Sequence, residues 1–244
     1  MANSVKPYSE QGSKKQQVGN MFDNIAPYYD LLNRVLSLGI DQRWRKAMIR
    51  ELAKVPHAQV LDVATGTADV ALAIRKNLPD VQHITGLDLS YEMLEVGRQK
   101  IAKKNWTADI DMIQGDSENL PFADDSFDAI TVAFGVRNFE NLEAGLREMH
   151  RVLRPGGKLL VLEFSRPTVF PLKQGFNFYF KNILPQIGKW QSKDPRAYEY
   201  LYESVQAFPD GADFLAVLAR TGYSATTVDP QTFGICSLYT GVKG

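Results

Sequence analysis

The feature that most constrains the fold is a regular alternation of short apolar runs and longer amphipathic segments from Gln59 to Phe164. Short apolar runs predict buried strands, and apolar residues spaced three and four apart predict helices. Parallel strands need crossover connections, so this alternation predicts an α/β fold with a parallel sheet covered on both faces. The predicted strands are 59–63, 83–87, 110–114, 127–134 and 158–164, separated by helices at 68–77, 91–104 and 142–153, the last one ended by Arg154-Pro155-Gly156-Gly157.

We interpret the rest of the chain as parts of the same domain, residues 16–244. Helical spacing from Val18 to Leu36, interrupted at Pro27, and a second helix at 43–54 predict an N-terminal helical part. The expected divisions are a polar, frayed segment 1–15, N-terminal helices 16–55, a ligand-binding core 59–164, an aromatic-rich cap 165–208, and a last part 209–244 with a helix at 211–220 and strand-like runs at 225–228 and 235–242.

Composition excludes several classes of protein. The 28 basic and 28 acidic side chains give a net charge of zero, which argues against a nucleic-acid binder, and short basic clusters such as Lys14-Lys15 are expected to be solvated. No apolar stretch approaches the roughly 18 residues of a membrane span, and the polar opening residues resemble no targeting peptide, so we expect a cytoplasmic protein. The single Cys236 is expected to be a buried thiol, and the separated His57, His83 and His150 predict no metal site.

A cofactor site is predicted after the first strand, where ligands of open parallel sheets bind. Gly66 permits a sharp turn in the loop Asp62–Thr67, and Asp88 follows Gly66 by 22 residues, close to the offset of an acid that binds ribose hydroxyls. The loop has one glycine rather than a full phosphate-binding motif, so a nucleoside without phosphates fits better than a dinucleotide.

S-adenosyl-L-methionine is such a cofactor. Its methionine part is expected along the Asp62–Thr67 loop, its ribose at Asp88 and its adenine near Leu89 and Met93. Asp116, after the third strand, is a candidate acceptor for the adenine amino group.

The fourth strand delivers Arg137 and Asn138 to the same edge of the sheet, where they would face the transferable methyl group. Arginine stays protonated and stabilises negative charge instead of accepting a proton. This pair therefore indicates an anionic nucleophile.

Five sequence blocks stand out: Tyr29–Ser37 with Asp41 and Trp44, Asp62–Thr67, Gly86–Asp88, Phe134–Asn138 and Arg151–Ser165. Together they resemble the menaquinone and ubiquinone biosynthesis C-methyltransferase family of class I S-adenosylmethionine enzymes, over 15–244. Differences from the family pattern are Leu32 for Met, Asp41 for His, Ala68 for Gly and, relative to some members, Ala133 for Ser.

The resemblance implies a Rossmann-like, mostly parallel seven-stranded sheet that ends in a β-hairpin. It implies cofactor contacts at Thr67, Asp88, Asp116 and Ser117, and a polyprenylated hydroquinone substrate, most simply 2-demethylmenaquinol. The alternatives are the 2-polyprenyl-6-methoxybenzoquinol precursor of ubiquinone, or both quinols, or a soluble oxygen or amine nucleophile.

From this resemblance we hypothesise that Arg137 stabilises the quinolate, that Asn138 orients it, and that Tyr29 and Asp30 close the site. None of the three histidines is placed as a base, so a water or a carboxylate, Asp30 or Asp69, is the expected proton acceptor. A nicotinamide dehydrogenase and a non-catalytic binding protein are the rival classes, distinguished by NAD binding and by a lack of S-adenosylmethionine affinity.

The segment 165–208 holds ten aromatic residues among 44, about twice the average for the chain. A polyprenyl quinol resides in the bilayer, so these aromatic rings are expected to line an apolar tunnel and to make transient, peripheral contact with the inner face of the membrane. The alternative is that they pack the cap against the sheet. The sequence does not determine the oligomeric state, for which a homodimer is one option.

Overall fold

A computed structural model describes residues 5–9, 11–37, 39–179, 182 and 196–244. It contains a seven-stranded sheet of order β3-β2-β1-β4-β5-β7-β6, in which β7 runs opposite to the other six strands. The strands are β1 Gln59–Val63, β2 His83–Asp88, β3 Ile110–Gln114, β4 Phe127–Ala133, β5 Leu153–Phe164, β6 Tyr223–Gln231 and β7 Cys236–Lys243. The predicted α/β fold and its terminal hairpin are confirmed.

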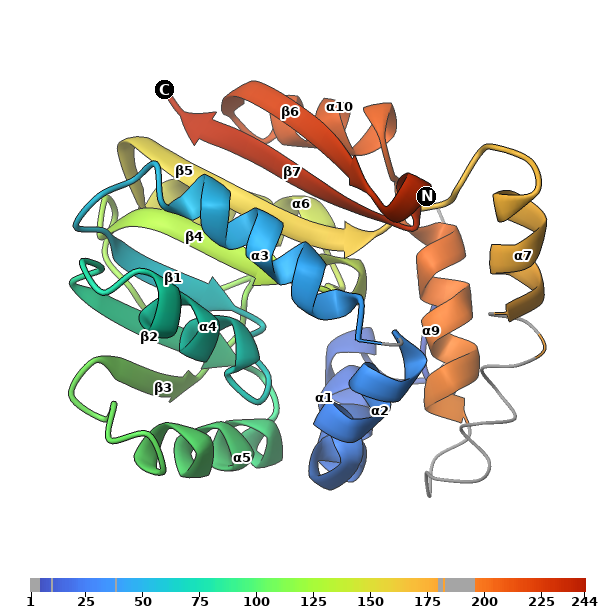
Figure 1. Ribbon diagram of the computed structural model, residues 1–244, viewed down its shortest axis with the longest axis horizontal. Helices are drawn as coiled ribbons and strands as arrows, with labels where there is room; N and C mark the ends of the chain where they lie inside the picture. The colour runs from blue at the N-terminus through green and yellow to red at the C-terminus, as the bar shows by residue number, and fades with distance from the viewer. Residues whose placement is uncertain (1–4, 10, 38, 180–181, 183–195) are drawn as a thin grey trace.

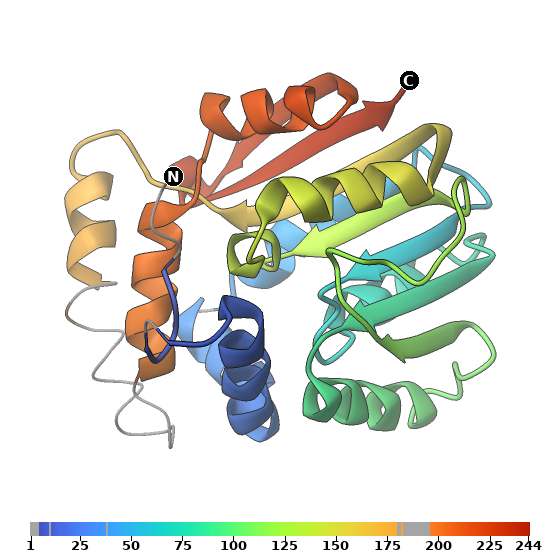
Figure 2. The ribbon, with the colours of Figure 1, turned by 180° about the vertical axis from the view of Figure 1, so that it is seen from behind.

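Helices cover both faces of the sheet (Figures 1 and 2). Helices α3 (Asp41–Leu52), α4 (Asp69–Asn77) and α5 (Tyr91–Ala102) share one apolar cluster with the sheet, and α6 (Leu142–Val152) and α10 (Ala212–Arg220) share the other. The central strands are buried on both sides, with Leu61, Ile130 and Leu160 fully inaccessible. The continuous apolar runs that predicted them reflect this double covering.

The remaining helices gather beyond the carboxyl ends of the parallel strands (Figure 1). They are α1 (Lys14–Ile25), the 3₁₀ turn η1 (Ala26–Tyr28), α2 (Tyr29–Leu36), α7 (Leu172–Phe178) and α9 (Arg196–Ala207). Pro27 lies within η1, so the predicted interruption of the first helix is confirmed. No helix in the described ranges combines the length and apolarity that a bilayer span requires.

Two local expectations were wrong. Helix α1 begins at Lys14, and Gln17 receives hydrogen bonds from the backbone amides of Tyr8 and Ser9, so the described residues before 15 fold back on α1. Helix α6 ends at Val152, just before residues 154–157 as predicted, but β5 begins at Leu153 instead of 158, because Leu153 already pairs with Phe127. Phe180 and Trp190, two of the ten aromatic residues of the segment 165–208, lie outside the described residues.

Candidate functional site

The loop after β1 is held in an uncommon conformation. Ala64, Gly66 and Ala68 all have positive φ, at 53°, 55° and 64°, and Ala68 leads directly into α4. Alanine pays an energetic penalty of the order of 1 kcal/mol in this region, whereas glycine does not. The surrounding contacts therefore impose the loop shape, and the glycine predicted at its turn is the residue that adopts it most easily.

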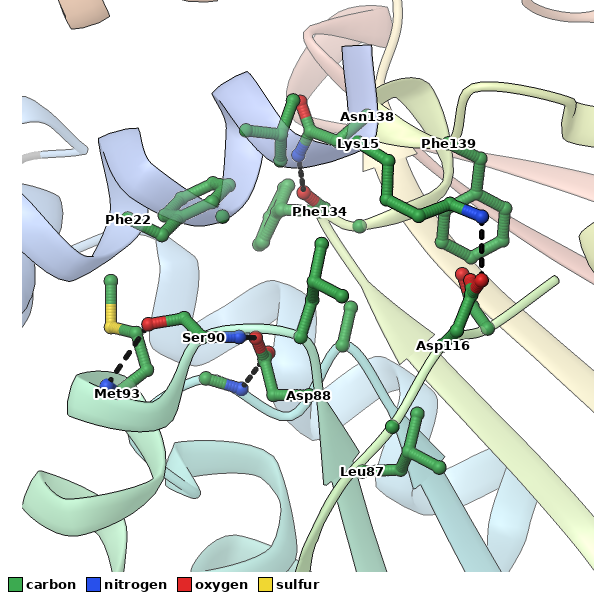
Figure 3. Close-up of a pocket in the computed structure, with 18 of the residues that line it drawn as sticks. Lys15, Phe22, Leu87, Asp88, Ser90, Met93, Asp116, Phe134, Asn138 and Phe139 are labelled. Atoms are coloured by element: carbon green, nitrogen blue, oxygen red, sulfur yellow. Dashed lines mark hydrogen bonds and ion pairs between the residues drawn. The ribbon is translucent and has the colours of Figure 1, made fainter. Parts of the chain in front are cut away.

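Asp88 fixes this loop from the end of β2. Its Oδ2 accepts a 2.7 Å hydrogen bond from the amide of Gly66, and its Oδ1 accepts a 2.9 Å bond from the amide of Ser90 (Figure 3). Burial raises the pKa of the Asp88 carboxyl, against the effect of these amides. Asp88, Gly66 and Leu89 line a small cavity of about 80 Å³ at this edge of the sheet.

Asp62 has a supporting position beneath the loop. Its two carboxylate oxygens accept hydrogen bonds from the hydroxyls of Thr65 and Thr131, at 2.7 and 2.6 Å. The side chain is buried and absent from the cavity wall, and burial raises its pKa to about 6. The structure therefore places Asp62 behind the loop and outside the cavity wall, where the sequence predicted a direct cofactor contact.

Asp116 and Ser117 line the small cavity as predicted, but Asp116 already has a partner. Lys15 of α1 places its Nζ 2.5 Å from the Asp116 Oδ2 and 3.5 Å from the Glu118 Oε2 (Figure 3). An adenine amino group would share this carboxylate with Lys15.

Thr67 and Asp30 lie outside the small cavity and bind each other. The Thr67 hydroxyl donates to Asp30 Oδ1 at 2.5 Å, and Lys100 donates to Asp30 Oδ2 at 2.7 Å and also to Asp69. Arg45 pairs with the second oxygen of Asp69 at 2.8 Å. Burial acts to raise the pKa of Asp69, but the positive charges of Arg45 and Lys100 outweigh it and lower this pKa. This network connects α2 to the loop after β1. Because Asp30 and Asp69 are both ion-paired, neither carboxylate is well placed to accept a proton from a substrate.

A second, larger cavity of about 420 Å³ lies against the first. Its wall is mostly apolar and comes mainly from α1, α2, α3, α7 and α9, which contribute Trp44 and Phe176. The end of β5 contributes Phe164. The Trp44, Phe134 and Phe164 rings pack together with centroids 4.8 to 6.1 Å apart. Four residues line both cavities and form their common wall: Phe22, Tyr29, Phe134 and Asn138.

Arg137 and Asn138 belong to the 3₁₀ turn η2 (Val136–Asn138) after β4. Asn138 lines both cavities, and Arg137 lines only the larger one. Arg137 forms a 2.8 Å ion pair with Glu163 of β5, and its guanidinium lies 5.5 Å from the centroid of the Phe164 ring. Burial raises the pKa of Glu163, although the charge of Arg137 opposes this effect.

The sequence interpretation missed two residues that organise this edge. Glu163 is a fully buried acid that directly follows the apolar run Leu159–Leu162 near the end of β5, a signal that could have identified it. Lys14 was expected to be solvated, yet it is 6% exposed and donates to the carbonyls of Arg137 and Phe139, at 2.9 and 3.0 Å. Burial, with the charge of Arg137, lowers its pKa to about 8. Lys14 thus fixes α1 on the turn that carries Arg137.

A parallel sheet of this order with a terminal antiparallel hairpin, and with an acid at the end of β2 that lines a small cavity, defines a class I methyltransferase fold. A solved structure from Thermotoga maritima, titled as an S-adenosylmethionine-dependent methyltransferase and possible histamine N-methyltransferase, shares this fold. It aligns with a TM-score of 0.67 over 93% of this chain and 99% of that chain, at 16% identity.

The sequence places the chain within one family of that class. Residues 10–243 match the ubiE/COQ5 methyltransferase family, and the chain belongs to this family. A demethylmenaquinone methyltransferase from Bacteroides fragilis is 49% identical over 98% of this chain and 97% of its own length. A ubiquinone/menaquinone biosynthesis C-methyltransferase from Geotalea daltonii is 48% identical over 96% of this chain and 98% of its own length. The predicted family and methyltransferase class are confirmed.

Proposed function

We propose that this protein transfers a methyl group from S-adenosyl-L-methionine to a ring carbon of a polyprenylated hydroquinone, converting 2-demethylmenaquinol to menaquinol. The observation that carries the proposal is the wall shared by two cavities. The small cavity is lined in part by the acids Asp88 and Asp116, and the large cavity is mostly apolar. A nucleoside-sized cofactor and a hydrophobic ring substrate in these cavities would be separated only by Phe22, Tyr29, Phe134 and Asn138. The names of the Bacteroides and Geotalea relatives support the same reaction.

The residues of the small cavity fit the cofactor. Asp88 offers carboxylate oxygens to ribose hydroxyls, and Leu89, Met93 and Phe139 offer apolar surface to adenine. When bound, the cofactor supplies an electrophilic methyl group on a sulfonium. Asp62 and Thr67 act indirectly, by holding the loop and the α2 helix that frame this cavity.

The residues of the large cavity fit a quinol that has lost one proton. Negative charge on a phenolic oxygen delocalises onto the neighbouring ring carbon, which would attack the methyl group. The new C–C bond would form as the C–S bond of the sulfonium breaks, which leaves S-adenosylhomocysteine. The hydrogen on the methylated carbon would then leave as a proton and the oxygen would regain one, which restores the aromatic quinol. Arg137 supplies a fixed positive charge for that oxygen, and Asn138, which touches both cavities, orients the ring. A solvent water accepts the proton in this scheme, because Asp30 and Asp69 are ion-paired and His57, His83 and His150 line neither cavity.

The direct test is methyl transfer from labelled S-adenosylmethionine to a reduced, short-chain demethylmenaquinone. The same assay with a demethylated ubiquinone precursor tests the alternative that the Geotalea name raises. We expect transfer to the naphthoquinol, and loss of turnover in Arg137→Ala with cofactor binding retained. Transfer to a soluble phenol or amine but to neither quinol would contradict the proposal, as would near-wild-type turnover in a folded Arg137→Ala variant.

A membrane-resident quinol would enter by transient, peripheral contact of the α7 region with the cytoplasmic face of the membrane. Val169, Phe170 and Phe178 are 61%, 76% and 60% exposed around α7, and Pro171, Leu172 and Phe176 beside them line the large cavity. Phe176 is buried, so it is unsuited to testing this contact. Replacing Phe170 and Phe178 by serine should weaken cosedimentation with neutral vesicles, whereas the control Tyr91→Ser on exposed α5 should not. Unchanged vesicle binding in the double variant would count against this route.

A further inference from the structure

Three buried polar atoms without hydrogen-bond partners belong to residues that line the large cavity. They are Arg137 Nε, Asn138 Oδ1 and Tyr200 Oη. A buried polar group without a partner typically costs about 1–3 kcal/mol of stability. Two further such atoms among the described residues, on Arg75 and Gln206, belong to side chains that line neither cavity. The concentration of unpaired atoms at one cavity indicates a ligand that pairs with them.

Tyr200 lies on α9, which packs against the η2 turn carrying Arg137 and Asn138. The phenol is 1% exposed, and the charges of Arg137 and Glu163 both act on it. Burial raises the pKa of the Tyr200 hydroxyl well above its ordinary value. The hydroxyl therefore stays protonated and can donate a hydrogen bond at any pH at which the protein works.

We propose that Tyr200 is a substrate-binding residue whose hydroxyl donates a hydrogen bond to the ionised oxygen of the aromatic substrate. This inference rests on the proposed function and deepens it. Arg137 Nε and Tyr200 Oη are donors, so they would hold the oxygen that carries negative charge. Asn138 Oδ1 is an acceptor, so it would hold the other hydroxyl, which keeps its proton. The asymmetry selects which hydroxyl ionises, and thus which ring carbon becomes nucleophilic.

The test compares Tyr200→Phe with Tyr223→Phe. Tyr223 is also buried, but its hydroxyl donates to the Leu146 carbonyl at 3.1 Å and lines neither cavity. We expect Tyr200→Phe to lower kcat/KM for the quinol roughly 10- to 100-fold, the range of one hydrogen bond to a charged group, with no loss of thermal stability. Tyr223→Phe should show the opposite pattern, with a lower Tm and an unchanged kcat/KM.

A second measurement does not depend on turnover. 1-Naphthol is an aromatic hydroxyl probe whose absorbance distinguishes naphthol from naphtholate. Bound to the cofactor-loaded wild type, it should ionise at a lower pH than in water, and Tyr200→Phe should move that pH upward by about one unit or more. Tyr223→Phe should leave it unchanged.

The outcomes separate this inference from the proposed function. If the wild type methylates no quinol, the proposed function fails, and the naphthol titration still decides the role of Tyr200. An active wild type with equal kcat/KM in Tyr200→Phe, or an unshifted naphthol titration, would overturn the inference alone. A decrease in kcat/KM that is matched by lost stability or lost cofactor affinity would also overturn it, because those effects indicate a structural role.

Discussion

Arg137 and Glu163 form a buried ion pair, with Nη1 and Oε1 2.8 Å apart and side chains 8% and 0% exposed. Arg137 lies in η2, just after β4, and Glu163 lies near the end of the neighbouring parallel strand β5, so the sheet brings the two residues to the same edge. Glu163 also accepts a hydrogen bond from the Phe164 amide. The pair holds a permanent cation at the wall of an apolar cavity, where water would otherwise have to solvate it.

Replacing Glu163 by glutamine should be strongly destabilising. The change leaves the buried guanidinium without its counterion, and breaking one partner of such a pair typically costs about 3–5 kcal/mol. Urea denaturation of Glu163→Gln measures this loss, and methyl transfer should fall as Arg137 loses its orientation. Glu143→Gln is the matched control, because Glu143 pairs with Arg147 and Arg220 at the surface. Equal stability of the two variants would argue against the proposed role of the pair.

Asp88→Asn should weaken cofactor binding. The amide side chain loses the negative charge and one of two acceptor oxygens, while the Gly66 and Ser90 amides still need acceptors. Because hydrogen bonds to charged groups contribute about 1.5–3 kcal/mol, we expect the Kd for S-adenosylmethionine to rise roughly 10- to 100-fold by calorimetry. Asp111→Asn on the exposed part of β3 serves as the control and should bind normally. An unaltered Kd in Asp88→Asn would remove Asp88 from the cofactor site.

The sheet could be predicted because its strands are short, apolar and buried on both faces. Strands 59–63 and 110–114 match the structure at both ends. The predicted start of the first helix lies C-terminal to its observed start at Lys14. The reason is that Lys14 and Gln17 are polar in sequence yet buried against other segments. Gln17 binds the chain before α1, and Lys14 binds carbonyls more than 100 residues away. Propensity and periodicity contain no information about such long-range partners.

Prediction of the candidate site from the sequence meets the same limit. The glycine turn and Asp88 could be located because they lie at fixed positions after adjacent strands. The sequence could not show that Asp62 and Thr67 support the loop from outside the cavity, or that Lys15 binds Asp116. Those assignments depend on where side chains of α1, α2 and β4 point after folding.

The stability of the protein should depend on Asp62 in mildly acidic solution. Its pKa is about 6 in the folded protein and near 3.8 in the unfolded chain, so between these values the folded state holds the proton more tightly. Stability should therefore fall as pH rises from about 4 to about 6, by up to about 3 kcal/mol from this group. The difference in unfolding free energy between wild type and Asp62→Asn isolates this contribution from other acids. A difference that stays constant from pH 4 to pH 7 would contradict the assignment.

The final prediction concerns Lys100, which joins Asp30 of α2 to Asp69 at the start of α4. Lys100→Met keeps the apolar stem but removes the cation, so two carboxylates and the Thr67 hydroxyl lose their common partner. The repulsion between Asp30 and Asp69 should loosen α2 over the cofactor loop, and amide hydrogen exchange in residues 29–36 should become faster. Because Tyr29 of α2 lines both cavities, we expect the KM for the cofactor and the quinol to rise together. The control is Lys54→Met, which removes an exposed pair with Glu51. Faster exchange with unchanged KM values would show that the network stabilises α2 without shaping the site.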